Sequence, residues 1–89
     1  MENALPSRQA LENLWRGRLE IADSEYRAAR VAVVEAGELQ SQIPSPDGNL
    51  ALSKALRAEK LALAEYRRVL TIFTNLLVDG TIPSGDVNR

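Results

Sequence analysis

The strongest constraint on this chain is a pair of apolar stripes, one in each half, that match when one is read backwards against the other. Positions spaced alternately by three and four residues share one face of an α-helix. The first half carries such a stripe at Trp15, Leu19, Ala22, Tyr26, Ala29, Val33, Ala36 and Gln40. The second half carries one at Leu52, Leu56, Glu59, Leu63, Tyr66, Leu70, Phe73 and Leu77. In antiparallel order, from Trp15 with Leu77 to Gln40 with Leu52, every pair of residue numbers adds up to the same total. The stripes therefore predict two long helices, folded back on each other in one register.

A segment rich in turn-forming residues lies midway between the two stripes. It reads Ile43-Pro44-Ser45-Pro46-Asp47-Gly48-Asn49. Each proline disfavours the helical conformation in the residue before it, and Asp, Gly and Asn form turns readily. We therefore expect a turn over residues 43–49, with Asp47 or Asn49 as the cap of the second helix.

The outer ends of the two helices carry their own signals. Pro6 and Ser7 suit the start of a first helix that covers about 7–42. Gly80 is placed to end a second helix over about 50–78, and Pro83 to block its continuation. Residues 80–89 are expected to be a polar tail. The fold class predicted for residues 1–89 is thus all-α, a single domain formed by an antiparallel two-helix hairpin.

The composition argues against most catalytic chemistries. The 89 residues include no histidine and no cysteine, so the usual components of catalytic zinc sites and of Ser-His or thiolate mechanisms are missing. Glu20 and Asp23 offer carboxylates, but they alternate with Arg16 and Arg27, a pattern typical of a solvated helix surface with weak ion pairs. We therefore expect no enzyme, no cofactor, no bound metal and no small-molecule substrate.

Targeting and membrane signals are also missing from the sequence. The first residues lack the basic stretch and apolar run of a signal peptide. No segment approaches the roughly 18 consecutive apolar residues of a membrane span. The expectation is a soluble protein of the cytoplasm.

The most basic stretch of the chain is Arg67-Arg68, with Lys54, Arg57 and Lys60 before it. Nucleic-acid binding needs an excess of Lys and Arg on one surface. Here Glu59 and Glu65 are interleaved, and the 11 basic residues face 12 acidic ones in the whole chain. A small nucleic-acid-associated regulator is therefore the least favoured of the functions considered.

Apolar residues extend beyond the two stripes, and one partner helix cannot cover so wide an arc. We predict that the surplus forms an interface, with these candidate residues: Leu61, Val69, Ile72, Leu76, Leu14 and Ile21. Large contiguous apolar patches on soluble proteins usually mark interfaces. The predicted function is that of a scaffold or adaptor that binds itself or another helical protein, with a dimeric four-helix bundle as the expected assembly.

Two segments of the chain partly resemble known families. Trp15-Arg16-Gly17 has the form found in the family of small secreted helical hairpins that is named after its Trp-x-Gly motif. In that family the motif lies in the turn, whereas here it lies within the first helix, so we interpret Trp15 as a core residue that faces Leu77. A hairpin with a Pro-Ser-Pro-Asp turn also resembles the needle subunits of type III secretion, which polymerise through their helices. That resemblance supports a second hypothesis, a structural subunit of a filament or other polymer.

Two details of the predicted seam between the helices stay open at this level. Glu25-Tyr26-Arg27 recurs as Glu65-Tyr66-Arg67, and the two tyrosines share a layer, but three matching residues do not establish a repeat. Glu59 falls among apolar positions, where an unpaired charge is costly. We expect its flexible side chain to reach solvent at the edge of the seam.

Overall fold

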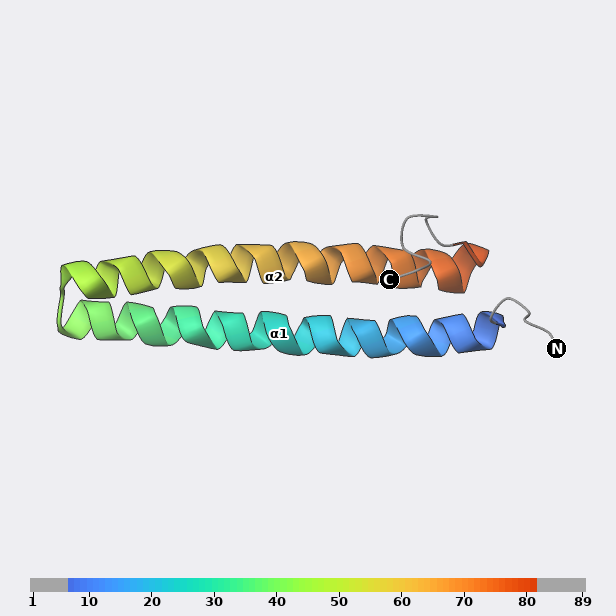
Figure 1. Cartoon of the computed structure of the whole chain (residues 1–89), viewed down its shortest axis with the longest axis horizontal. Coiled ribbons are helices and arrows are strands. Elements are labelled where there is room, and N and C mark those ends of the chain that lie inside the picture. The colour runs from blue at the N-terminus through green and yellow to red at the C-terminus, as the bar shows by residue number, and fades with distance from the viewer. Residues whose placement is uncertain (1–6, 82–89) are drawn as a thin grey trace.

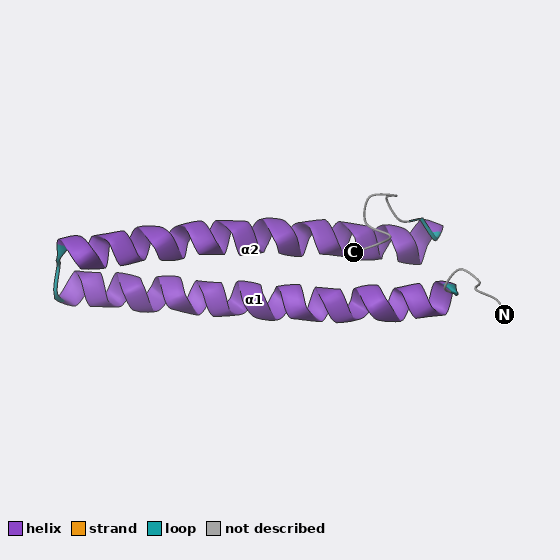
Figure 2. Cartoon of the chain, viewed as in Figure 1, coloured by secondary structure: helices purple, strands orange, loops and turns teal. Residues whose placement is uncertain are grey.

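Two long antiparallel helices make up the described part of the chain, residues 7–81 of a computed structural model. Helix α1 spans Arg8–Gln42 and helix α2 spans Pro46–Asp79. They lie side by side over their whole length, as Figures 1 and 2 show, in a rod of 62 × 19 × 18 Å. The all-α hairpin predicted from the stripes is therefore confirmed.

Helix α1 begins and ends within one residue of its expected bounds. The Ser7 hydroxyl accepts a hydrogen bond from the Ala10 amide at 3.1 Å, which satisfies one of the free donors of the first turn. At the other end, the amide of Ile43 still donates to Leu39 O at 2.9 Å. Pro44 follows, so the chain leaves the helix there.

The start of α2 corrects the expected turn. The helix begins at Pro46 rather than near Leu50, and its cap is Ser45, whose hydroxyl accepts from the Gly48 amide at 2.9 Å. Proline has no N–H to satisfy and a backbone angle suited to the first helical position, so Pro46 starts the helix instead of prolonging the turn. The turn is thus three residues long, 43–45, and α2 gains one helical turn at its start.

The open end of the rod is closed by a contact between the two helices. Gly80 ends α2 in the left-handed conformation, with φ of 72°, and its amide donates to Leu76 O. Arg8, in the first turn of α1, donates through Nη2 to Leu76 O at 3.0 Å and to Leu77 O at 2.7 Å. No basic residue lies in the last turn of α2, so Arg8 brings the cation that favours a helix C-terminus from the neighbouring helix. Of the polar tail expected over 80–89, all but the first two residues lie outside the described part.

The register between the helices follows the predicted pairing. The rings of Tyr26 and Tyr66 stack with centroids 6.1 Å apart and planes inclined by 18°. Nearer the turn, Arg30 Nε lies 3.9 Å from Glu59 Oε2. Glu59 is half-buried at the edge of the seam, as expected, and it gains an arginine partner from α1.

The rotation of α2 about its own axis differs from the expectation. Every α1 residue of the predicted stripe is buried or half-buried. On α2, half of the stripe is replaced by the residues one position earlier, so the observed seam runs through Leu52, Ala55, Glu59, Ala62, Tyr66, Val69, Phe73 and Leu76. Leu70 and Leu77 are 38% and 43% exposed, whereas Val69 and Leu76 are 2% and 0% exposed. Trp15 packs at the predicted level of α2, but in the cluster that contains Leu76, one position before the predicted Leu77.

The burial of Trp15 accounts for this rotation. Trp15 is the largest side chain of the seam and is only 1% exposed, in one cluster with Ala22, Val69, Ile72 and Leu76. At about 100° per residue, Ile72 lies near Val69 and Leu76 around the helix but about 160° from Leu70. A seam centred on Leu70 would therefore turn Ile72 into solvent and uncover one wall of the tryptophan site.

Candidate interaction surfaces

The six residues predicted to form an interface fall into two groups. Leu14, Ile21 and Leu61 are exposed, with 44%, 61% and 66% of their surface accessible. The other three are buried inside the hairpin: Val69, Ile72 and Leu76. The expectation that these three have no partner within the chain is wrong, because the rotation of α2 turns them into the seam. The candidate surface is thus reduced to its three exposed members.

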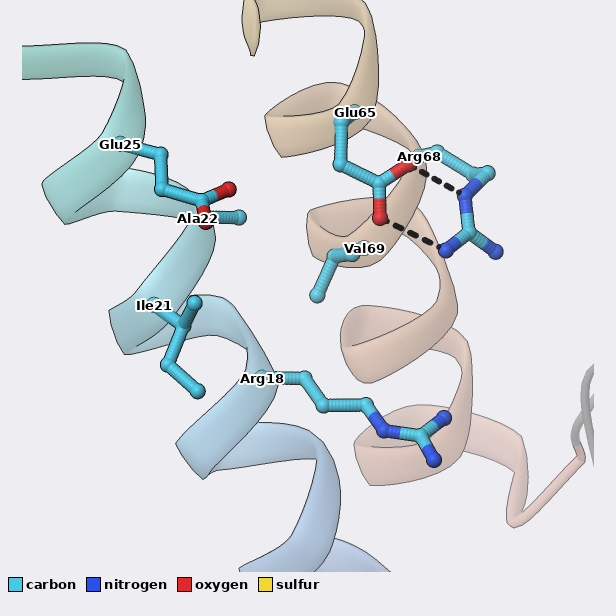
Figure 3. A pocket seen from close by; sticks show the side chains of 7 residues that line it. All are labelled: Arg18, Ile21, Ala22, Glu25, Glu65, Arg68 and Val69. Carbon is cyan, nitrogen blue, oxygen red and sulfur yellow. Dashed lines mark hydrogen bonds and ion pairs between the residues drawn. The ribbon is translucent and has the colours of Figure 1, made fainter. Parts of the chain in front are cut away.

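A shallow groove lies along the side of the seam that carries these exposed members. Figure 3 shows its lining: Arg18, Ile21, Ala22, Glu25, Glu65, Arg68 and Val69. Arg68 holds Glu65 through two hydrogen bonds, Nε to Oε1 at 2.9 Å and Nη2 to Oε2 at 2.8 Å. Leu61 lies one helical turn before Glu65 and so continues the same side of α2. This side, called the groove face below, presents apolar side chains between two arginines and two glutamates.

The opposite side of the rod carries a row of leucines that the sequence analysis placed in the seam. This leucine stripe consists of Leu56, Leu63, Leu70 and Leu77, at seven-residue intervals along α2. Leu63 is half-buried and the other three are exposed. Leu70 lies about 160° around the helix from Arg68, which places the stripe on the far side from the groove.

The helix α1 contributes charged residues to the same side as the stripe. They are, in chain order, Glu20, Asp23, Arg27 and Arg30, at spacings of three and four residues. Asp23 and Arg27 pair within the helix at 3.2 Å, and Arg30 reaches across the seam to Glu59. Arg16 lies over the ring of Phe73, 5.4 Å from its centroid. Beside the middle of the leucine stripe, α1 thus presents two acids followed by two bases, with Arg16 one helical turn before them.

Sequence reasoning missed the stripe because both edges of the α2 seam are apolar. Ala55 and Ala62 lie on the buried edge, whereas the larger Leu56 and Leu63 lie one position later. Because leucine side chains are larger than alanine side chains, the sequence pattern indicated that the leucines form the core. A usable signal was present in Ile72, which continues the edge of Val69 and Leu76 but not the edge of Leu70.

Within residues 7–81 no arrangement for metal binding was found. The structure brings no three carboxylates, histidines or cysteines together there. Glu20 and Asp23, the carboxylates considered from the sequence, lie on the helix surface, and Asp23 is engaged by Arg27.

No significant match to this chain was found among the models of known protein families, the curated proteins or the solved structures. Over the described residues, neither helix combines the length and the apolar character that crossing a membrane requires.

Proposed function

We propose that this protein is a non-enzymatic interaction module that works through the faces of a rigid helical hairpin, by binding itself or another helical protein. The main support is the balance between buried and exposed apolar groups. Among the described residues five are buried, Trp15, Ala22, Val69, Ile72 and Leu76, whereas twelve large apolar side chains are exposed. Single exposed apolar residues are common, but rows of them along one helix usually mark a contact surface.

The size of the core supports the same proposal. A hairpin with one seam leaves most of the circumference of each helix in solvent, and small domains of this kind gain little net stability from their core alone. Near the turn the seam is formed largely by alanine, at Ala29, Ala36, Ala55 and Ala62. Contact with further helices would bury additional apolar surface and stabilise the fold at about 25 cal/mol per Å².

Among the possible assemblies, a dimeric four-helix bundle is the form that we expect. Two-fold closure is the commonest arrangement of soluble homo-oligomers, whereas a filament needs two different complementary patches. The filament subunit therefore stays the second hypothesis.

Sedimentation equilibrium over a range of micromolar concentrations tests the proposal. We expect a species of twice the chain mass that dissociates on dilution. Growth without limit on concentration would favour the filament. A helical monomer at all concentrations would rule out self-association and leave binding to another helical protein as the remaining form of the proposal.

A further inference from the structure

We propose that the leucine stripe is the contact surface between two copies of this chain, related by a two-fold axis at the level of the Tyr26–Tyr66 stack. This inference rests on the proposed function and deepens it. It names a second copy as the partner and moves the contact from the groove face to the opposite side of the rod.

The spacing of the stripe defines the position of the axis on α2. A two-fold axis perpendicular to a helix places each residue against the one equally distant on the other side of the axis. With the axis midway between Leu63 and Leu70, Leu63 meets Leu70 of the second copy, and Leu56 meets Leu77. Every leucine of the stripe is then covered by another leucine, which removes apolar surface from water on both copies.

The charges on α1 define the position of the axis independently. The register observed at the tyrosine stack places Glu25 and Tyr26 level with the point midway between Leu63 and Leu70. About that same level, Glu20 meets Arg30 of the second copy, and Asp23 meets Arg27. These four pairs near the axis are of opposite sign, whereas Glu12 and Glu38, at the same angles farther along α1, meet with like charge. The spacing of the leucines on α2 and the pairing of opposite charges on α1 therefore define the same two-fold axis.

The axis also leaves the two rods almost fully overlapped. Helix α1 spans Arg8–Gln42, so Glu25 lies at its middle. An axis near either end would overlap only part of each rod and would leave leucines of the stripe uncovered. The axis that the charges define is therefore also the axis that buries the most surface between the two rods.

The other side-by-side arrangement on this face is less complementary. A two-fold axis along the length of the rod would set α1 of one copy over α2 of the other, level by level. The leucine stripe of one copy would then face the charged edge of α1 of the other copy instead of a second leucine stripe. The carboxylates and guanidinium groups of that edge would lose water there without an opposite charge.

The groove face offers no single axis of this kind. On α1, the point midway between Arg18 and Glu25 lies between Ile21 and Ala22. On α2, the point midway between Glu65 and Arg68 lies at the level of the tyrosine stack. These two levels lie four residues apart, about 6 Å along a helix at 1.5 Å per residue. A dimer through the groove face could satisfy the charges of one helix but not of both.

In the proposed dimer, Arg67 of one copy lies close to Arg67 of the second copy, so that two like charges face each other. Arg67 lies on α2 beside the axis, between Leu63 and Leu70, and its side chain is exposed. A long arginine side chain can keep its guanidinium in water while its stem covers apolar surface. Arg67→Leu removes the repulsion and is expected to tighten the dimer about tenfold.

The first test compares two leucines on opposite sides of the rod in the full chain. Leu70→Glu places a charge in the proposed interface and is expected to raise the dimer dissociation constant at least about 100-fold, with helicity retained. Leu61→Glu on the groove face is the matched control and is expected to change this constant less than about threefold. Sedimentation equilibrium gives the constants, and circular dichroism checks that both variants fold.

The second test uses charge reversal, so that a loss can be rescued. The variant E20R/D23R carries four bases along this edge of α1, and R27E/R30E carries four acids. Each alone is expected to dimerise about tenfold more weakly than the unaltered chain. An equimolar mixture is expected to form a heterodimer as tight as the unaltered dimer, because the four pairs near the axis are again of opposite sign. An effect confined to one chain cannot be rescued by mixing.

The outcomes separate this inference from the proposed function. Dimers that persist in Leu70→Glu but dissociate in Leu61→Glu would overturn the leucine stripe and retain self-association through the groove face. Failure of the mixture to dimerise would overturn the two-fold axis stated here. A monomeric unaltered chain would overturn the inference altogether, while binding to a different helical protein would still stand as proposed.

Discussion

At the scale of single residues, Arg8 links the start of α1 to the last turn of α2. Its guanidinium binds Leu76 O and Leu77 O on α2 and also pairs with Glu12 on its own helix at 3.2 Å. Carbonyls in the last turn of a helix have no partner within that helix. Arg8 therefore supplies the free carbonyls of α2 with the hydrogen bonds and positive charge that a basic residue in the last turn of α2 would supply.

Replacing Arg8 with alanine tests this contact. The loss of the two hydrogen bonds is expected to lower the free energy of unfolding by about 1 kcal/mol, since the side chain is half exposed and water can replace it in part. Urea denaturation followed by circular dichroism measures the change. Gln9→Ala is the control, because Gln9 bonds only to Asn13 on its own helix. Equal midpoints for the two variants would show that Arg8 contributes nothing to the closure.

A second residue-scale prediction tests the rotation of α2. Leu76 is fully buried and Leu77 is exposed, although the two are adjacent in sequence. Leu76→Ala is expected to destabilise the hairpin by about 2–5 kcal/mol through lost burial and a cavity. Leu77→Ala is expected to cost less than about 1 kcal/mol when measured at a protein concentration low enough to keep the chain monomeric. The reverse order would restore the seam expected from the sequence.

At the scale of the elements, the two helices depend differently on their glycines. Gly17 lies in the interior of α1, and nothing lies within 4 Å of the point that a Cβ would occupy. Alanine there reduces the freedom of the unfolded chain and introduces no clash. Gly17→Ala is expected to stabilise the hairpin by about 1 kcal/mol, a rise in Tm of roughly 4–8 °C for a domain of this size. An unchanged or lower Tm would mean that this turn of α1 is not helical in solution.

Gly48 is the matched contrast in the first turn of α2. A Cβ there would collide with the side-chain oxygen of Gln40, which accepts a hydrogen bond from the Ser45 amide at 3.2 Å. Gly48→Ala should displace Gln40 and loosen the three-residue turn, which offsets the gain of about 1 kcal/mol that alanine brings at Gly17 and leaves the free energy of unfolding nearly unchanged. In the Gln40→Ala background nothing is displaced, so the same change should stabilise the hairpin by about 1 kcal/mol. Equal effects in both backgrounds would locate the clash elsewhere.

At the scale of the whole molecule, the two-fold arrangement predicts the shape of the assembly. A single rod measures 62 × 19 × 18 Å. Two rods that overlap along the leucine stripe keep nearly the same greatest length, whereas end-to-end or staggered polymers grow longer with each copy. Small-angle X-ray scattering across a concentration series is expected to show a dimer of about doubled cross-section and little added length. A length that increases with concentration would favour the filament hypothesis.

The sequence alone accounts for much of this architecture. Helix-capping and turn chemistry at Ser7, Pro44 and Gly80 act locally, so the limits of the helices could be predicted from the residues around them. The error at the start of α2 was also local, since Pro46 serves equally as a turn residue and as the first residue of a helix. The layer shared by Tyr26 and Tyr66 followed from the spacing of the stripes and is confirmed by the stacked rings.

The rotation of α2 could not be predicted in the same way. The apolar arc of this helix is wider than one seam, and its period is the same whichever edge is buried. The choice between Leu70 and Val69 depends on how Trp15, more than fifty residues away in sequence, packs against Ile72 and Leu76. Packing of this kind involves side chains from both helices at once, and no pattern within one helix contains it. The helices, their ends and their register are therefore properties of the sequence pattern, while the identity of the exposed leucines, and with it the candidate interface, comes from the packing of the folded hairpin.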